Sequence, residues 1–298
     1  MAGAADAGTW TIRRILEWTT GFFTRKEVNM PRLSAELLLA HVLNVPRIKL
    51  YTDFDRTLAD KDLATFRALV QRAAEQEPIA YLTGKAHFFN LEFEVTRDVL
   101  IPRPDTETLV ENVLQLARNQ PGMTAPRVLD LCTGSGCIAA AIGYHLKNAV
   151  VVATELSPAA VVVARRNIER LGLTGRVTVE QGDLFEPLRH LVDAQPFQLV
   201  VANPPYIPTG QLDALDRSVR DYEPLAALDG GLDGLGLHRR ILAEAPARLV
   251  PGGRVYLEIA FDQGALAREV AAGYPEFEDV RMLKDSAGRE RVLTGRRK

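Results

Sequence analysis

Residues 128–137 read VLDLCTGSGC and carry the strongest indication of the fold. A short apolar run is followed at once by two closely spaced glycines, and residues 138–142 then form an apolar run that predicts a helix. A strand, a glycine loop and a helix in this order let the backbone approach a nucleotide-like ligand closely. A tight turn that binds nothing gives the same pattern, so the strands that follow must decide between the two.

From residue 127 onward, predicted strands alternate with predicted helices. Such alternation favours an α/β protein with a parallel sheet and helices on both faces. The last two strands have only the turn-like residues 285–288 between them, so we expect them to pair antiparallel at one edge. Seven strands with an antiparallel last strand resemble the Rossmann-like methyltransferase fold. The predicted strands are residues 127–132, 149–154, 176–181, 197–202, 253–259, 277–283 and 290–295, with helices near 136–147, 158–171, 236–249 and 262–272.

The first part of the chain has a different pattern. Apolar residues recur at helical spacing over residues 12–23, Pro31 opens a second helical pattern, and residues 63–73 supply a third. Short helices with short connections favour a small bundle, and the alternating apolar pattern of residues 86–101 predicts a β-hairpin after it. The predicted domains are therefore a helical domain at residues 1–85, a β-hairpin linker at 86–105 and the α/β domain at 106–298.

Composition limits the classes of function. The 298 residues include 36 Lys and Arg against 38 Asp and Glu, a formal net charge of −2, whereas a duplex nucleic-acid binder usually carries a basic surface. Residues 1–85 hold 12 basic and 10 acidic side chains with the signs interspersed. No apolar run approaches the roughly 18 residues that cross a bilayer, and the first residues lack the pattern of a signal peptide. We therefore expect a cytoplasmic protein without direct nucleic-acid or membrane binding, and the two cysteines and five scattered histidines predict no metal site.

Two acids after the next strands favour an adenosine-containing cofactor. Glu155 ends the second strand, 21 residues after Gly134, where a carboxylate hydrogen-bonds a ribose in Rossmann-type sites. Asp183 follows the third strand, where it could accept from an adenine amino group while the Leu184 backbone serves the ring edge. Ala139 replaces the third glycine of the dinucleotide pattern, which argues only modestly against NAD. The alternative for both Glu155 and Asp183 is that each is an ordinary solvent-exposed carboxylate at a strand end or turn and binds no cofactor.

The most specific motif is Asn203-Pro204-Pro205-Tyr206, which comes directly after the predicted strand 197–202. The two prolines remove two backbone donors and fix both φ angles, so the loop is stiff and its carbonyls are free to accept. The Asn203 side-chain oxygen and the Pro204 carbonyl form an acceptor pair for the two N–H bonds of an NH2 group, and Tyr206 offers a flat wall. An amide or aromatic NH2 is a poor nucleophile. A site that aims its lone pair at an electrophilic methyl group would therefore accelerate methyl transfer.

Taken together, the motifs resemble the HemK/PrmC family of protein-glutamine N5-methyltransferases. The resemblance extends over about the whole chain. It implies transfer of a methyl group from S-adenosyl-L-methionine to the glutamine of the Gly-Gly-Gln motif in class I peptide chain release factors. The matching segments are residues 78–84, 88–93, 99–107, 130–137, 153–157, 182–185, 203–206, 222–224, 227–231 and 257–259.

The resemblance also implies a role for each motif. Glu155 would take the ribose, Asp183 and Leu184 the adenine, and the Asn-Pro-Pro-Tyr residues the substrate glutamine, with Asn203 also beside the cofactor. The helical domain would recognise the release factor, while the role of residues 102–107 stays open. Cys132 stands where the family commonly has glycine, and Glu155 where it commonly has aspartate. The methionine part of the cofactor would be held by the loop residues Cys132, Thr133, Gly134, Ser135 and Gly136.

Three other functions remain as alternatives. Adenine-N6 methyltransferases of DNA or RNA share Asn-Pro-Pro-Tyr, but they need a basic surface to hold a strand, and the helical domain is nearly neutral. A glutamine methyltransferase of a ribosomal protein has a similar layout. A binding module without activity is the third alternative, against which the intact Asn203, Tyr206 and Glu155 argue.

Overall fold

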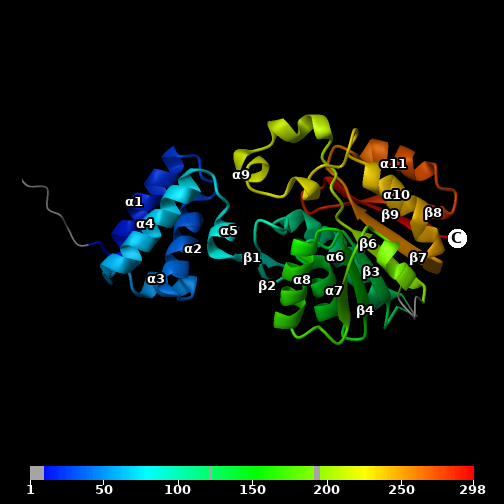
Figure 1. The fold of residues 1–298 in the computed structure, drawn as a ribbon, viewed down its shortest axis with the longest axis horizontal. Coiled ribbons are helices and arrows are strands. Elements are labelled where there is room, and N and C mark those ends of the chain that lie inside the picture. The colour runs from blue at the N-terminus through cyan, green and yellow to red at the C-terminus, as the bar shows by residue number, and fades with distance from the viewer. Residues whose placement is uncertain (1–9, 121–122, 191–194) are drawn as a thin grey trace, which may run out of the picture. The chain divides into compact units, whose positions relative to one another are not determined.

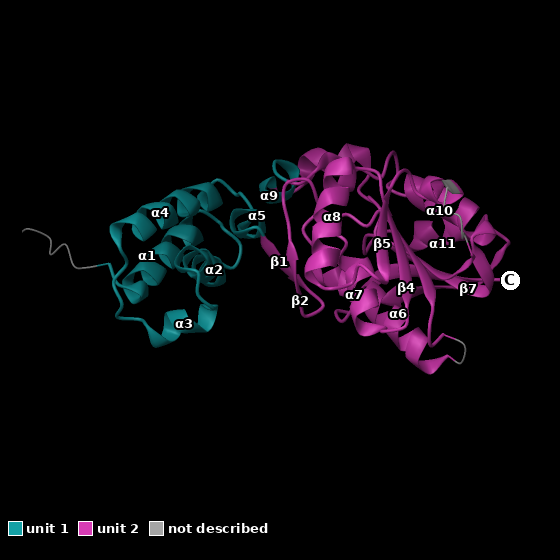
Figure 2. Ribbon diagram, turned by 60° about the horizontal axis from the view of Figure 1, so that its bottom comes forward, with its two compact units in different colours: residues 1–84, 217–222 teal, residues 85–216, 223–298 magenta. Residues whose placement is uncertain are grey.

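The structure is a computed structural model that describes residues 10–120, 123–190 and 195–298. The chain forms two compact units, one of residues 1–84 with 217–222 and one of residues 85–216 with 223–298 (Figures 1 and 2). The first, called unit 1, is helical, and the second, called unit 2, contains both β-sheets.

Unit 1 is a bundle of short helices with a core of its own. Its first helix begins where the Thr11 side chain accepts the Arg14 backbone N–H, and the predicted apolar stripe is the face that it buries. The Tyr222 hydroxyl donates to the Glu75 carbonyl at 3.0 Å, which joins the segment 217–222 to the bundle. The helices are α1 (Ile12–Arg25), α2 (Pro31–Leu43), α3 (Arg47–Thr52), α4 (Asp60–Ala74), α5 (Ile79–Thr83) and α9 (Arg217–Arg220).

Unit 2 begins with a β-hairpin of β1 (Lys85–Phe88) and β2 (Leu91–Glu94). Its turn residues Phe89 and Asn90 both have positive φ, 49° and 61°, as a two-residue hairpin turn requires. The expected hairpin over residues 86–101 is too long. Strand pairing ends at Glu94 because a turn follows, in which the Thr96 hydroxyl oxygen accepts the Asp98 backbone N–H.

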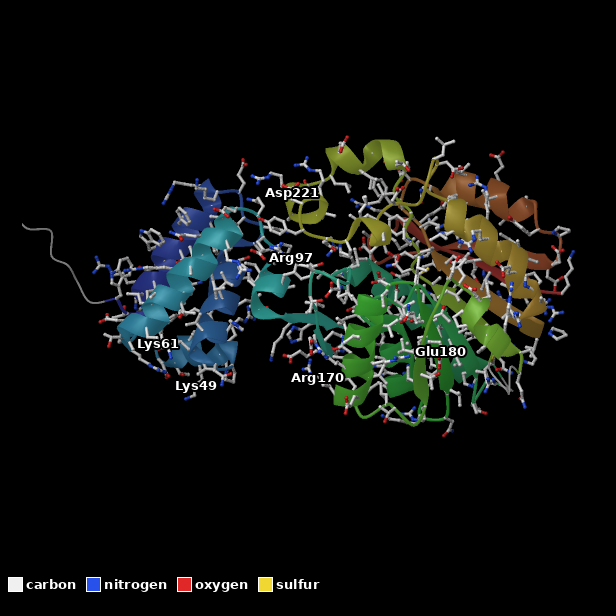
Figure 3. The ribbon with its side chains drawn as sticks, viewed as in Figure 1. Lys49, Lys61, Arg97, Arg170, Glu180 and Asp221 are labelled. Carbon is white, nitrogen blue, oxygen red and sulfur yellow. The ribbon has the colours of Figure 1, made fainter. Side chains whose placement is uncertain are left out.

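Ion pairs and hydrogen bonds fasten this hairpin to α8 (Pro158–Arg170). Arg170, labelled in Figure 3, pairs with Glu92 at 3.1 Å. The Asn167 side chain meets the backbone of Glu94 from both sides, since its Oδ1 accepts the amide N–H at 2.7 Å and its Nδ2 donates to the carbonyl at 2.9 Å. The hairpin is therefore part of unit 2.

The large sheet has seven strands in the order β5-β4-β3-β6-β7-β9-β8. Its first five strands in this order run parallel, and β9 is antiparallel to both of its neighbours. The predicted fold class, a seven-stranded methyltransferase-like sheet with an antiparallel last strand, is confirmed. The strands are β3 (Arg127–Leu131), β4 (Val150–Glu155), β5 (Val177–Gln181), β6 (Phe197–Ala202), β7 (Leu249–Glu258), β8 (Phe277–Lys284) and β9 (Glu290–Arg297).

Helices cover both faces of the sheet (Figure 1). One buried apolar cluster contains side chains of α6, α7 and α8, and a second contains side chains of α10 and α11. The helix expected near 236–249 is shorter, because Pro246 lies in the 3-10 turn that follows its last residue, Glu244. The other elements of unit 2 are α6 (Glu107–Asn119), α7 (Cys137–His145), α10 (Gly236–Glu244), α11 (Gly264–Ala272) and the 3-10 turns η1 (Pro104–Thr106), η2 (Glu186–His190), η3 (Thr209–Ala214), η4 (Leu225–Ala227) and η5 (Ala245–Ala247).

Candidate active site

The glycine loop, residues 132–136, is held from behind by a buried carboxylate. Asp130 in β3 is fully buried, and its Oδ2 accepts from the Thr133 hydroxyl at 2.6 Å and from the Ala139 backbone N–H at 3.1 Å. Burial raises the pKa of Asp130 to about 7, although both hydrogen bonds act in the opposite direction. One side chain thus ties the strand, the loop and α7 together. From the sequence, Asp130 had no role beyond its place in the segment 130–137, which matches the HemK/PrmC pattern.

Three residues of the glycine loop adopt positive φ: Cys132 at 57°, Gly134 at 55° and Gly136 at 80°. A Cβ on Gly136 would lie 3.3 Å from the Cβ of Ala164, so glycine here lets α7 pack closely against α8. A Cβ on Gly134 would meet no described atom within 4 Å, which leaves room for a ligand beside the loop. The backbone of Cys132 lies in the left-handed region, which glycine adopts more easily than any residue with a side chain. This agrees with the glycine that the HemK/PrmC family commonly has at this position.

Glu155 connects the end of β4 with the glycine loop. Its Oε2 accepts the Gly134 backbone N–H at 2.9 Å, and its Oε1 accepts the Ser157 backbone N–H, also at 2.9 Å. An ionised carboxylate has about four acceptor positions, so two remain for a hydroxyl pair such as a ribose presents.

Asp183 and Leu184 follow β5, as predicted, and lie at the same edge of the sheet as Glu155. The Glu155 carbonyl accepts the Gly182 backbone N–H at 2.9 Å, which brings the β4 and β5 ends together. Asp183 Oδ2 lies 2.6 Å from Nη2 of Arg240 in α10. The guanidinium of Arg240 therefore holds the Asp183 carboxylate, which we expected to bind the adenine. This role for Arg240 was not predicted from the sequence.

The Asn-Pro-Pro-Tyr loop, residues 203–206, starts at the same level of the sheet as the glycine loop. Ala202, the last residue of β6, pairs with Leu131, the last residue of β3. The strand order reverses between β3 and β6, which is where open α/β sheets bind their ligands. Pro204 and Pro205 are buried, while Asn203 and Tyr206 are partly exposed.

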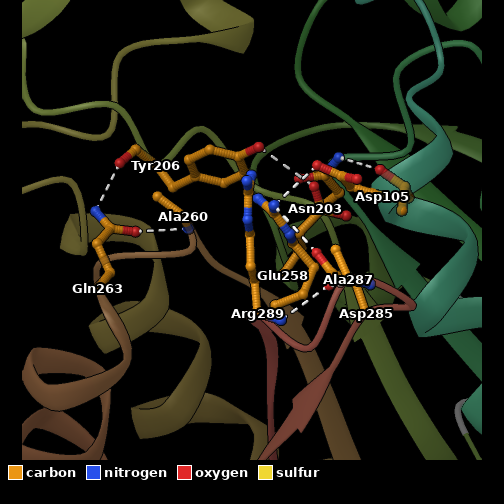
Figure 4. A network of polar contacts seen from close by, with 11 residues as sticks. Asp105, Asn203, Tyr206, Glu258, Ala260, Gln263, Asp285, Ala287 and Arg289 are labelled. Atoms are coloured by element: carbon orange, nitrogen blue, oxygen red, sulfur yellow. Dashed lines mark hydrogen bonds and ion pairs between the residues drawn. The ribbon is translucent and has the colours of Figure 1, made fainter.

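The two polar side chains of this loop contact residues from two other elements (Figure 4). Asn203 Nδ2 donates to Thr106 Oγ1 at 3.2 Å, and the Tyr206 hydroxyl donates to Glu258 Oε1 at 3.3 Å. Burial raises the pKa of Glu258 to about 7. Burial also raises the pKa of Tyr206, so its phenol remains an O–H donor at neutral pH.

Two glycines and a glutamine hold the backbone of the Asn-Pro-Pro-Tyr loop. A Cβ on Gly230 would come within 2.7 Å of Tyr206 Cα, and a Cβ on Gly234 would clash with the Tyr206 carbonyl oxygen. That oxygen accepts from Gln263 Nε2 at 2.8 Å, and Gln263 Oε1 in turn accepts the Ala260 backbone N–H at 2.9 Å. The backbone of Tyr206 therefore leaves no room for a side chain at Gly230 or Gly234.

Ion pairs bring residues 102–107 to the same edge. Arg103 pairs with the buried Glu223, whose Oε2 also accepts the Ile101 backbone N–H at 3.2 Å. Asp105 lies 2.9 Å from Nη2 of Arg291, a buried guanidinium of β9. The segment whose role the sequence left open is therefore fixed beside the Asn-Pro-Pro-Tyr loop.

The structure places every site residue predicted from the sequence at the carboxyl end of β3, β4, β5 or β6. Glu155 is the last residue of β4, and the others lie in the loops after β3, β5 and β6. Sequence reasoning missed the supporting residues Asp130, Arg240 and Gln263. Asp130, Thr106 and Glu258 had a weak signal, because all three lie in segments that match the HemK/PrmC pattern, but nothing in the sequence shows which residues they contact.

Comparison with known proteins agrees with this arrangement. Residues 14–84 match the PrmC N-terminal domain, and residues 105–220 match the methyltransferase small domain. A release factor glutamine methyltransferase of Geobacter sulfurreducens is 46% identical over 289 residues, which cover 96% of this chain and 97% of that protein. The chain belongs to the release factor glutamine methyltransferase family. One from Rhodopirellula baltica is 39% identical over 295 residues, or 99% of each chain. The resemblance seen in the sequence is confirmed, and the protein is a methyltransferase.

The release factor glutamine methyltransferase fold extends to more distant proteins. The crystal structure of the hMettl16 catalytic domain in complex with MAT2A 3'UTR hairpin 6 matches with a TM-score of 0.54 at 18% identity, covering 79% of this chain and 81% of that one. At this identity the match shows the fold alone. Within the described residues, no helix is long and apolar enough to span a membrane, and no three His, Cys, Asp or Glu side chains cluster as metal ligands would.

The residues present suit S-adenosyl-L-methionine, the methyl donor that the family implies. The open space beside Gly134 gives an extended ligand access to the loop backbone. Glu155 and Asp183, at the ends of neighbouring strands, offer acceptors for hydroxyl and amino groups. Donors and acceptors therefore occur in the order along the sheet edge that a methionine, a ribose and an adenine would need.

Proposed function

We propose that this enzyme transfers a methyl group from S-adenosyl-L-methionine to the side-chain amide nitrogen, N5, of the glutamine in the Gly-Gly-Gln motif of class I peptide chain release factors. The observation that carries the proposal is the Asn-Pro-Pro-Tyr loop at the end of β6, which lies beside the glycine loop at the end of β3. Relatives of nearly the same length that carry the name release factor glutamine methyltransferase support the choice of acceptor.

The chemistry requires the nitrogen to be held, because its lone pair is delocalised into the amide. The Asn203 side-chain oxygen and the Pro204 carbonyl accept the two N–H bonds, and Tyr206 packs against the planar group. The bound S-adenosyl-L-methionine supplies an electrophilic methyl group on a positively charged sulfur. Holding the nitrogen and the methyl group in line can lower the activation free energy of the transfer by about 7–11 kcal/mol in favourable cases. As the nitrogen–carbon bond forms, the carbon–sulfur bond would break and its electron pair would stay on the sulfur, which leaves as the neutral thioether. The nitrogen would lose one of its two protons to water.

We assign cofactor binding to residues at the carboxyl ends of β3, β4 and β5, together with Asn203 after β6. Glu155 would hold the ribose, Asp183 and Leu184 the adenine, and the glycine loop with Asn203 the methionine part. The loop residues in question are Cys132, Thr133, Gly134, Ser135 and Gly136.

We assign recognition of the release factor to the helical domain at residues 1–85. Residues 14–84 match the PrmC N-terminal domain, which supports the assignment of substrate recognition to residues 1–85. We assign methyl transfer to residues 106–298, with residues 86–105 connecting the two regions in the sequence. Release factors act in translation, so we place the enzyme in the cytoplasm, with no direct nucleic-acid or membrane partner.

Labelled S-adenosyl-L-methionine tests the proposal when the purified enzyme receives separate acceptors. We expect label on a class I release factor, located by peptide mapping at the glutamine of its Gly-Gly-Gln motif. Replacement of that glutamine in the release factor should abolish the label. Label confined to a ribosomal protein, or to the adenines of DNA or RNA, would overturn the choice of acceptor.

A further inference from the structure

Tyr206 is held at both of its polar ends by one short turn of the chain. Its carbonyl oxygen accepts from Gln263 Nε2 at 2.8 Å, and its hydroxyl donates to Glu258 Oε1 at 3.3 Å. Figure 4 shows these two contacts at opposite ends of the tyrosine. Glu258 is the last residue of β7 and Gln263 directly precedes α11, so we call residues 258–263 the β7–α11 turn.

The Gln263 side chain has its orientation set by a second partner. Gln263 is 7% exposed, and its Oε1 accepts the Ala260 backbone N–H at 2.9 Å. Because that N–H needs an oxygen opposite it, the NH2 end of the amide must face the Tyr206 carbonyl. A carboxylate of the same shape could still accept from Ala260, but it would set an oxygen against the oxygen of Tyr206.

The Glu258 carboxyl is buried behind the phenol of Tyr206 with part of its hydrogen-bonding capacity unused. Glu258 is fully buried, and its Oε2 has no hydrogen-bond partner among the described residues. A buried carboxyl with an unused oxygen is costly to the folded state, so stability alone does not account for its presence. Its contact with Tyr206 points to a role at the site.

The backbone of the β7–α11 turn is itself fixed. The Ile259 N–H donates to the Arg291 carbonyl of β9 at 2.9 Å, and Nε2 of the buried His238 lies 2.7 Å from the Glu258 carbonyl oxygen. Burial lowers the pKa of His238 to about 4, so its ring is neutral at pH 7 and can donate from Nε2. The turn is therefore a rigid support from which two side chains reach Tyr206.

We propose that the β7–α11 turn clamps Tyr206 at both ends, with Glu258 and Gln263 as positioning residues for the acceptor amide. This inference rests on the proposed function, in which the Tyr206 ring packs against the planar acceptor group. A ring released at either end can tilt, and the acceptor nitrogen then leaves its line with the methyl group. A misplacement of about 1 Å can cost a hundredfold in rate.

A double-mutant cycle tests the hydroxyl end of the clamp. Glu258→Met keeps the length of the side chain without its carboxyl oxygens, and Tyr206→Phe removes the hydroxyl. We expect each to lower kcat on a release factor about tenfold or more, with little change in KM or in the Kd for S-adenosyl-L-methionine. Because both changes remove the same contact, the double variant should be about as slow as either single one.

Glu258→Gln keeps an acceptor oxygen for the phenol and should restore most of the rate that E258M loses. A residue that served only the stability of the core would instead lower the rate of the Y206F enzyme further when it is replaced. Wild-type turnover in E258M, or losses that multiply in the double variant, would overturn the inference.

Gln263→Glu tests the carbonyl end, since it keeps the acceptor for Ala260 and removes the donor to Tyr206. We expect kcat to fall about tenfold or more, because two oxygens would face each other at hydrogen-bond distance, while the Kd for S-adenosyl-L-methionine changes little. The matched control is Gln115→Glu at an exposed position of α6, which should turn over at the wild-type rate. Wild-type turnover in Q263E would contradict the clamp.

A spectroscopic readout needs no acceptor. In enzyme whose tyrosines carry ¹³C at Cζ and at the carbonyl carbon, the Tyr206 resonances are assigned by their loss in Y206F. The Cζ resonance should move in E258M and the carbonyl resonance in Q263E, while the other tyrosines keep their positions, as in a folded variant. If either resonance stays in place in its own variant, the inference is wrong even where the enzyme methylates its release factor. If both move but the wild-type enzyme methylates no glutamine, the proposed function fails while the clamp stands.

Discussion

The backbone N–H of Gly134 donates to Glu155 Oε2 at 2.9 Å, across 21 positions of sequence. The contact links the turn after β3 with the end of β4, which pair along their length up to Leu131 and Thr154. The acid is therefore part of the glycine loop's own structure as well as a candidate ligand for a ribose. Its substitution should affect both.

Glu155→Gln should weaken cofactor binding. The amide keeps one acceptor oxygen but places an NH2 group against a backbone N–H, so the loop loses one of its two anchors and the ribose loses a carboxylate. We expect the Kd for S-adenosyl-L-methionine to rise about tenfold or more, measured by isothermal titration calorimetry, since hydrogen bonds to charged groups contribute about 1.5–3 kcal/mol. Glu180→Gln in β5 is the matched control. An unchanged Kd in E155Q would exclude Glu155 from the cofactor site.

Gly234→Ala should damage the Asn-Pro-Pro-Tyr loop. Gly234 has a φ of +80°, and its added methyl group would clash with the Tyr206 carbonyl oxygen. We expect the free energy of unfolding to fall by about 2–4 kcal/mol in urea titrations, from left-handed strain and overpacking together, with a loss of turnover. Gly210→Ala, where an added methyl group meets no described atom within 4 Å, should behave as wild type. Normal turnover in G234A would mean that the backbone of Tyr206 need not be held.

Asp130 should make the protein less stable as the pH rises toward neutrality. Its pKa is about 7 in the folded state, mainly through burial, against an ordinary value near 3.8. The folded state therefore keeps a proton that the unfolded chain releases, so this contribution is present below pH about 4 and is lost as pH rises through about 7. Its full size is on the order of 4 kcal/mol.

Asp130→Asn removes this contribution while its side-chain oxygen can still accept from Thr133 and Ala139. Urea unfolding of D130N between pH 4 and pH 7 should show a smaller decline in stability than the wild type. The exposed Asp98→Asn serves as the control and should decline as the wild type does. Equal slopes in D130N and wild type would show that Asp130 titrates normally in the folded protein.

The sequence predicted those parts of the fold that follow from the spacing of apolar and turn-forming residues along the chain. The order of strands and helices follows from periodicity, and the edge hairpin of β8 and β9 from the short turn between them. Residue types after each strand located the glycine loop, Glu155, Asp183 and the Asn-Pro-Pro-Tyr loop. These predictions succeeded because parallel strands bring their carboxyl ends to one edge.

Other features depend on contacts between distant segments, which no single-sequence pattern reports. Thr106 and Glu258 are ordinary residues in their own segments, and only the fold brings Thr106 to Asn203 and Glu258 to Tyr206. The short helices α3 and α5 are defined by six and five residues, too few for a helical stripe. The predicted hairpin was too long because residues 99–101 are apolar although they pair with no strand, and of these Val99 is buried.

The most direct test of the central claim is the effect of Asn203→Ala on two constants measured with one enzyme preparation. The claim is that Asn203 holds the acceptor nitrogen, so kcat on a release factor should fall by at least about a hundredfold, the size seen when one transition-state hydrogen bond is removed. The Kd for S-adenosyl-L-methionine should change only a few-fold. Equal losses in turnover and in cofactor affinity, or near-normal turnover, would contradict the claim.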